Sequence, residues 1–308
     1  MHGWGVTEAL AGLPDWVVLL FALLTQLADA WFVFGGLTLL YLLADDRLAA
    51  EPRSAGATLI ALAVCALATT VALKTAFGVH RPADAGTATA PAWLPGLLDA
   101  VYASIATGDG FGFPSGHATS SSVVYGGLAL TLDRLWTRRK RIAAAAGVVA
   151  VVALSRLVIG VHHLPDVLAG VVAGTAVLLA VHRFAGARPV RAFVAAAVLG
   201  VVALVAAVVF APDHPGEALK AAIAVGAGTG AAVAWHRVGG ESSHLGVRLA
   251  LPATAVFGAL WGVVYVGELP IPVTAAGSAL VVGALIALPW AVERYADGQS
   301  DFSITTSS

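Results

Sequence analysis

The chain has 308 residues, of which 59% are hydrophobic and only 11% are charged, and its mean hydropathy of +0.87 is far higher than a soluble domain needs. A formal net charge of -1 argues against a nucleic-acid partner, which favours a basic surface. The single cysteine, Cys65, excludes a disulfide within the chain and a cysteine-rich metal site. The composition therefore predicts an all-α, polytopic membrane protein.

Apolar runs long enough to cross about 30 Å of hydrocarbon, roughly 20 residues each, follow one another along the chain. We expect about nine spans of this kind. They lie at residues 16–43, 55–77, 117–132, 142–161, 164–181, 193–211, 218–235, 247–266 and 273–292. The first run is longer than one span requires and contains Asp29, which either serves function or caps a helix at a bend. The N-terminus lacks the features of a removable signal peptide, so we expect the first run to be retained.

The distribution of basic residues predicts the orientation of these spans. Loops rich in Lys and Arg alternate with loops poor in charge, and the loops at 212–217 and 267–272 contain neither residue. The basic loops hold Arg47, Arg53, Arg134, Arg138, Arg139, Lys140, Arg141, Arg183, Arg188, Arg191, Arg237, Arg248 and Arg294. This pattern predicts an external N-terminus, a cytoplasmic C-terminus and a 78–116 connection on the external face of the cell membrane.

Three stretches in the first 170 residues carry groups suited to a phosphate. They are Lys74 to Pro82 (KTAFGVHRP), Pro114 to His117 (PSGH), and Ser155-Arg156 followed by His162 and Asp166. Lys74, Arg81 and Arg156 supply cations for phosphoryl oxygens, Arg by planar bidentate contact and Lys as a point charge. Ser115 and Gly116 precede an apolar run, so we expect their N–H groups to point from a helix N-terminus toward an anion.

His162 is the predicted nucleophile, with Asp166 as its partner. At a spacing of four on a helix the two share a face, so the carboxylate can accept from one ring nitrogen and leave the other free to attack phosphorus. We expect His117 to protonate the leaving oxygen and later to activate the water that cleaves the phosphohistidine. These roles together describe phosphoryl transfer without a metal.

The three stretches resemble the signatures of the type 2 phosphatidic acid phosphatase (PAP2) superfamily, which contains membrane lipid phosphatases and soluble vanadium haloperoxidases. These signatures are Lys, six residues, Arg-Pro; then Pro-Ser-Gly-His; then Ser-Arg, five residues, His, three residues, Asp. The sequence fits each of them in the family order, and the resemblance covers roughly residues 16–185. It implies a haloperoxidase-like helical core, metal-independent hydrolysis through a phosphohistidine without a cofactor, and Ser155 as added support near the phosphate.

Three neighbouring residues bear on this assignment. His163 adjoins His162, but His162 has the family spacing to both Arg156 and Asp166. Val79 and His80 stand where many family members carry further polar or basic residues before the Arg-Pro, which predicts an unusual substrate-facing edge.

The chain divides into three predicted parts. Residues 1–185 form the PAP2-like catalytic transmembrane domain, residues 186–296 a C-terminal transmembrane extension, and residues 297–308 a polar tail. Gly226, Gly228 and Gly230 in the extension favour close helix contacts, either within the chain or in a homo-oligomer. On the predicted external side, His214 and Glu217, with Lys220 one turn further on, either extend a headgroup site or cap a span.

We predict a phosphatase that acts on a lipid phosphate or lipid pyrophosphate at the external leaflet, with the bilayer as its setting. A substrate whose tail lies in the bilayer brings its headgroup to the ends of the spans, where the three stretches meet. A membrane phosphotransferase that passes the phosphate to an acceptor hydroxyl is an alternative. A lipid transporter or flippase is another, and it predicts transport that persists after His162→Ala. The membrane setting disfavours a haloperoxidase.

Overall fold

The computed structural model describes residues 5–239 and 244–305, and nearly all regular structure in these ranges is helical. An isolated antiparallel bridge joins His80 to Phe111. The helices are α1 (Val6–Leu10), α2 (Asp15–Leu24), the 3-10 helix η1 (Thr25–Ala28), α3 (Ala30–Leu43), α4 (Pro52–Phe77), the 3-10 helix η2 (Gly96–Leu98), α5 (Asp99–Ala106), α6 (Gly116–Thr131), α7 (Arg138–Val158), α8 (Leu164–Ala185), α9 (Pro189–Phe210), α10 (Pro215–Val238), α11 (Val247–Val266) and α12 (Ile271–Thr305). The all-α prediction is confirmed.

The protein is a polytopic transmembrane helix bundle. Within the described residues, 7 helices are long and apolar enough to span a membrane, namely α4 and α7 to α12. The first apolar run forms a bent pair that would add an eighth span, because α2 with η1 meets α3 at 47°. The run predicted at 117–132 is α6, which has 16 residues and is shorter than the others. The expectation of about nine spans thus agrees roughly with the structure.

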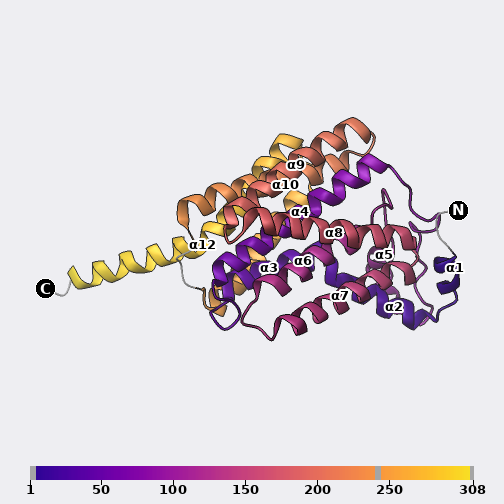
Figure 1. The fold of residues 1–308 in the computed structure, drawn as a ribbon, viewed down its shortest axis with the longest axis horizontal. Helices are drawn as coiled ribbons and strands as arrows, with labels where there is room; N and C mark the ends of the chain where they lie inside the picture. The colour runs from indigo at the N-terminus through magenta and orange to yellow at the C-terminus, as the bar shows by residue number, and fades with distance from the viewer. Residues whose placement is uncertain (1–4, 240–243, 306–308) are drawn as a thin grey trace.

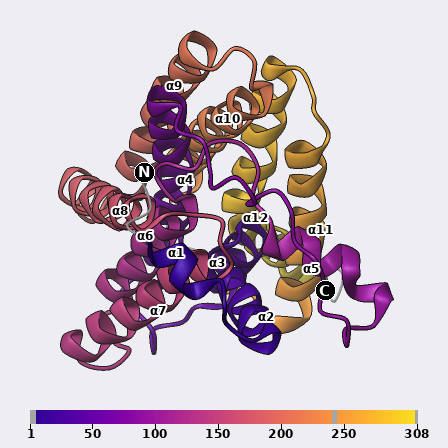
Figure 2. The same cartoon turned by 90° about the vertical axis from the view of Figure 1, so that its right-hand side faces the viewer.

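Helix α4 is the centre of the bundle. Most of its residues are buried, and it packs against α3, α6, α9 and α10. Seen from one end, α7 and α8 lie on one side of it and α11 and α12 on the other (Figure 2). The helix ends where Gly78 adopts a left-handed backbone with φ of 60°, a conformation that favours glycine. This turn leaves Lys74 in the last helical turn and directs the chain toward Arg81.

The C-terminal extension packs directly on the N-terminal half of the chain. Helix α9 lies along α4, and α10 lies between α9 and α12 (Figure 1). A buried polar contact adds to this packing, because the Tyr41 hydroxyl donates to the carbonyl oxygen of Ile286 at 2.6 Å and accepts from Arg53 at 2.5 Å. The extension is therefore part of one helical body with the segment that carries the three motifs.

Glycines on α10 allow this close packing. A Cβ atom at Gly226 would overlap the backbone of Ala275 on α12, and one at Gly228 would lie 2.5 Å from the backbone nitrogen of Ala197 on α9. The small residues of α10 therefore make contacts within the chain, as the first of the two sequence alternatives expected.

Gly226→Leu is expected to lower the melting temperature of the purified protein clearly. A leucine there forces α10 away from α12, and overpacking of this kind costs about 1–3 kcal/mol or more. Thermal unfolding followed by fluorescence or circular dichroism measures the effect. Gly147→Leu on α7 is the matched control, because a Cβ atom at Gly147 meets nothing within 4 Å. Equal melting temperatures for the two variants would contradict the prediction.

Candidate active site

The three motifs meet at one end of the bundle, which we call the site end. It is formed by the last turns of α4 and α7 and by the first turns of α6 and α8. The connections rich in Lys and Arg lie at the opposite helix ends, as the alternation of the helices requires. Residues that are far apart in the sequence are therefore neighbours, and most of them are buried.

His162 lies in the turn between α7 and α8 and is only 1% exposed. Its Nδ1 atom is 3.5 Å from Oδ2 of Asp166, and its Nε2 atom is 3.0 Å from Nη1 of Arg81. A guanidinium can only donate, so Nε2 is the acceptor and the ring proton is on Nδ1, facing Asp166. This tautomer has its lone pair on the nitrogen that faces the cation.

Burial and positive charge hold the pKa of His162 well below its ordinary value of 6.5. Desolvation is the largest cause, and the charges of Arg81, Arg156, Lys74 and His117 add to it. The imidazole is thus neutral at neutral pH, which is the form that can act as a nucleophile. The three predicted phosphate-binding cations are all among the charges that lower this pKa.

Arg81 reaches the ring from the connection that follows α4. Its Nε atom donates to the carbonyl oxygen of Asp109 at 2.7 Å, and its Nη1 atom donates to that of Val161 at 3.1 Å. Burial lowers the pKa of Arg81, whereas the carboxylates of Asp109, Asp166 and Glu217 raise it. The guanidinium therefore stays charged and is held by two backbone contacts beside Nε2 of the histidine.

Asp166 joins two parts of the site. Its Oδ2 atom accepts from the N–H of His163 at 2.8 Å, which caps α8. Its carbonyl oxygen accepts from the N–H of Ser115 at 2.9 Å. The expectation that the Ser115 N–H is free for an anion is therefore wrong, because that donor is used to join α8 to α6. Helix geometry leaves the N–H groups of Gly116 to Ala118 without an intrahelical partner, and these are available instead.

Lys74, Ser155 and Arg156 are also at the site end, and they differ in their hydrogen-bond partners. Lys74 and Arg156 are 8% and 3% exposed. Arg156 donates from Nη1 to the hydroxyl of Thr25 at 3.0 Å. The hydroxyl of Ser155 donates to the carbonyl oxygen of Val152 at 2.7 Å, within α7, rather than to another residue of the site.

Several buried polar atoms of the site have no hydrogen-bond partner among the described residues. They are Oγ of Ser115, Nε of Arg156 and Nε2 of His117. Buried polar groups in proteins are nearly always paired, so a cluster of such atoms indicates a place for an absent polar ligand. Donors from Arg and Ser suit an anion. In the described ranges, no group of three or more His, Cys, Asp and Glu side chains is arranged to hold a metal ion.

The site also includes residues that the motifs do not contain. Asp29 caps α3 by accepting from the N–H of Ala30 at 2.7 Å, and its Oδ2 atom is 3.9 Å from Nε2 of His117. Thr25, on η1, contacts Arg156. The ionisable Asp29 inside an apolar run was the available sequence signal. The cap at a bend is confirmed, and the side chain also lies beside His117.

Glu217 and Lys220, at the start of α10, are close to this site. The two side chains form an ion pair at 3.0 Å, and Glu217 is 6% exposed. Gly110 follows Asp109, whose carbonyl oxygen binds Arg81. A Cβ atom at Gly110 would lie 3.8 Å from Oε1 of Glu217, so Glu217 is next to the loop that holds Arg81. The C-terminal extension thus contributes charged residues to the rim of the site.

The contact between Asp29 and His117 can be tested with a pair of variants. Asp29→Asn keeps an N-cap acceptor but removes the charge, whereas Asp29→Ala removes both. One charge at about 4 Å contributes about 1 kcal/mol in water, so both variants are expected to lower kcat/KM about fivefold. Steady-state phosphate release measures this. A loss confined to Asp29→Ala would assign the residue to capping alone.

A comparison with known families agrees with this geometry. The family model of the PAP2 superfamily matches residues 54–189, which include all three motifs. Neither a curated protein nor a solved structure matches the chain. The fold and the matched family define an integral membrane enzyme of the phosphatase type. Residues 54–189 thus match the PAP2 superfamily, and the resemblance read from the motifs is confirmed for that segment.

Proposed function

We propose that the protein removes phosphate from a lipid phosphate or lipid pyrophosphate through a phosphohistidine on His162, at the external face of the cell membrane. The observation that carries the proposal is the arrangement around this ring. One nitrogen faces a carboxylate and the other faces a cation, among buried donors without partners. A phosphoryl group that replaces the contact between Arg81 and Nε2 would meet the nucleophile and its electrostatic support together.

In the first step, the Nε2 lone pair of His162 attacks phosphorus, and the bond from phosphorus to the leaving oxygen breaks. His117 gives a proton to that oxygen, in the protonated form that the negative charge of the bound phosphoryl group and of Asp29 favours. Charge on the other phosphoryl oxygens is stabilised by Lys74, Arg81 and Arg156 and by the N–H groups at the start of α6. The phosphorylated ring carries a positive charge, which Asp166 stabilises.

In the second step, water attacks the phosphohistidine. His117, now neutral, takes a proton from the water, and the bond between phosphorus and Nε2 breaks. Phosphate leaves and His162 returns to its neutral form with the proton on Nδ1. The two histidines thus recover their starting states in one cycle.

Two observations support a lipid substrate on the external side. The site lies at the ends of apolar helices, where the headgroup of a lipid would be. The basic connections lie at the opposite helix ends, and such connections favour the cytoplasm.

The test is phosphate release by the purified protein in EDTA from phosphatidate, phosphatidylglycerophosphate, polyprenyl pyrophosphate and a soluble sugar phosphate. Release from at least one lipid, with much weaker release from the sugar phosphate, is the expected result. Preference for the sugar phosphate, or release that EDTA abolishes, would overturn the proposal. Release that appears only with an added acceptor alcohol would identify a phosphotransferase.

The low pKa of His162 predicts the pH dependence of the reaction. His162 must be neutral to attack, so its ionisation sets the acid limb: activity is lost as pH falls through its pKa, which lies well below 6.5. His117 must carry a proton to act as the acid, so its ionisation sets the loss of activity at higher pH. The acid limb of kcat/KM reports the free enzyme and is therefore expected below pH 6.5, after correction for the ionisation of the substrate. A rate profile from about pH 4 to about pH 9 measures it. An acid limb above about pH 7 would contradict the assignment.

A further inference from the structure

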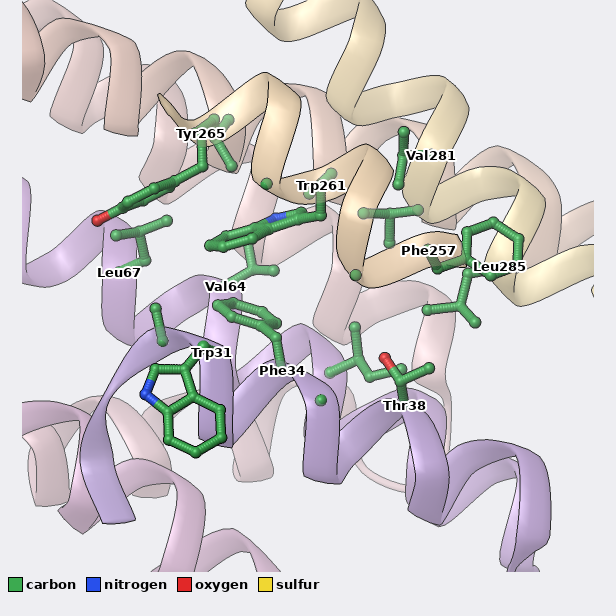
Figure 3. Close-up of a pocket in the computed structure, with 18 of the residues that line it drawn as sticks. Trp31, Phe34, Thr38, Val64, Leu67, Phe257, Trp261, Tyr265, Val281 and Leu285 are labelled. Carbon is green, nitrogen blue, oxygen red and sulfur yellow. The ribbon is translucent and has the colours of Figure 1, made fainter. Parts of the chain in front are cut away.

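An apolar cavity of about 500 Å³ lies between α3, α4, α10, α11 and α12. Its size is within the range of ligand pockets, roughly 300–1,000 Å³. Aliphatic and aromatic side chains from both halves of the chain form its walls, and Asp29 is the one charged residue among those that line it. Figure 3 shows Phe34 and Thr38 on α3, with Trp261 on α11 and Leu285 on α12 among the side chains that face them.

We infer that this cavity, which we call the tail cavity, holds one hydrocarbon chain of the lipid phosphate during the reaction. The inference rests on the proposed function and adds the part of the protein that recognises the lipid. It also gives the C-terminal extension a role, because α10, α11 and α12 supply much of the wall.

The tail cavity adjoins the site at Asp29. Asp29 lines the cavity, and its Oδ2 atom is 3.9 Å from Nε2 of His117. A lipid whose phosphate lies at His162 therefore has a short path for its chain past Asp29. A second apolar hollow, of about 520 Å³ between α6, α7 and α8, is lined by none of the predicted site residues.

The length of the tail cavity matches one leaflet of the bilayer. The cavity runs along α3 from Asp29 to Thr38, a distance of about 14 Å at 1.5 Å per residue. This is about half of the 30 Å hydrocarbon core, the depth that one leaflet occupies. A chain of a lipid in the leaflet next to the site would therefore fit along the cavity.

One wall of the tail cavity has an apolar outer face. Helix α11 forms one wall, and many of its large side chains are exposed, including Leu260 and Val263. It contacts α3 through Phe34 and Trp261, whose ring centroids are 5.1 Å apart. The outer face of this wall is apolar and suits the hydrocarbon of the bilayer, so a lipid chain that passes from the bilayer into the cavity stays in apolar surroundings.

The test uses two substrates with the same headgroup, a long-chain phosphatidate and a water-soluble short-chain phosphatidate. Gly258→Phe and Gly262→Phe place a ring in the cavity, because both glycines line it and a Cβ atom at either meets nothing within 4 Å. Gly147→Phe on α7 adds the same ring outside the cavity. We expect the cavity variants to lower kcat/KM for the long-chain substrate roughly tenfold or more. Activity toward the short-chain substrate should change less than about twofold, which also shows that the variants fold.

Equal losses of kcat/KM on both substrates would overturn the inference. No loss on either substrate would also overturn it, and would mean that the cavity holds a lipid that takes no part in the reaction. The proposed function itself is tested separately, with the parent protein alone. It would be overturned if the parent hydrolysed no lipid phosphate. As a second measurement, a lipid phosphate with a photoreactive group at the chain end is expected to label α3, α11 or α12. Labelling of α7 or α8 instead would place the chain in the other hollow.

Discussion

His162→Ala is expected to reduce phosphate release from the preferred lipid by roughly 10⁴-fold or more. The variant removes the atom that forms the covalent bond to phosphorus, so the reaction loses its intermediate and not only a contact. The cations and the α6 N-terminus remain, so substrate binding should change far less than kcat. Steady-state release and equilibrium binding of a labelled lipid phosphate measure the two effects separately.

His163→Ala is the matched control for this prediction. The two histidines are adjacent, but His163 is only partly buried, whereas His162 faces both Asp166 and Arg81. The control is expected to retain activity within about threefold. If His163→Ala were the inactive variant, the assignment of the nucleophile would be wrong.

Asp166→Asn is expected to lower kcat by roughly 10²- to 10³-fold. The amide oxygen can still accept from the N–H of His163, so the cap of α8 is kept. The negative charge is lost, however, and with it the stabilisation of the positive phosphorylated ring. The site is buried, so little water can replace that charge.

Thermal unfolding separates chemistry from stability in this variant. Asp166→Asn should keep a melting temperature close to that of the parent, whereas Asp166→Ala should also lose the cap, which contributes about 1 kcal/mol. Rapid-quench measurements are expected to show slower formation of phosphorylated protein in Asp166→Asn. Unchanged kcat would remove Asp166 from the mechanism.

Much of this protein is predictable from short stretches of its sequence. Length and apolarity identify the spans, because a helix must satisfy its own backbone hydrogen bonds in hydrocarbon. The offsets within the motifs, such as His162 to Asp166, predict a shared local geometry because they span one helical turn. The bend in the first apolar run was less predictable. It occurs at Asp29, where the side chain caps α3, and depends on the residues packed around that point.

Other features depend on contacts between distant segments. The sequence alone determined the class of the protein, its helices and its three motifs, since these follow from composition and local spacing. Only the tertiary structure decided that Asp29 meets His117, that the Ser115 N–H binds Asp166, and that α11 closes a cavity beside the site. Such contacts join residues whose separation in the chain carries no periodic signal, so packing of the whole bundle is what brings them together.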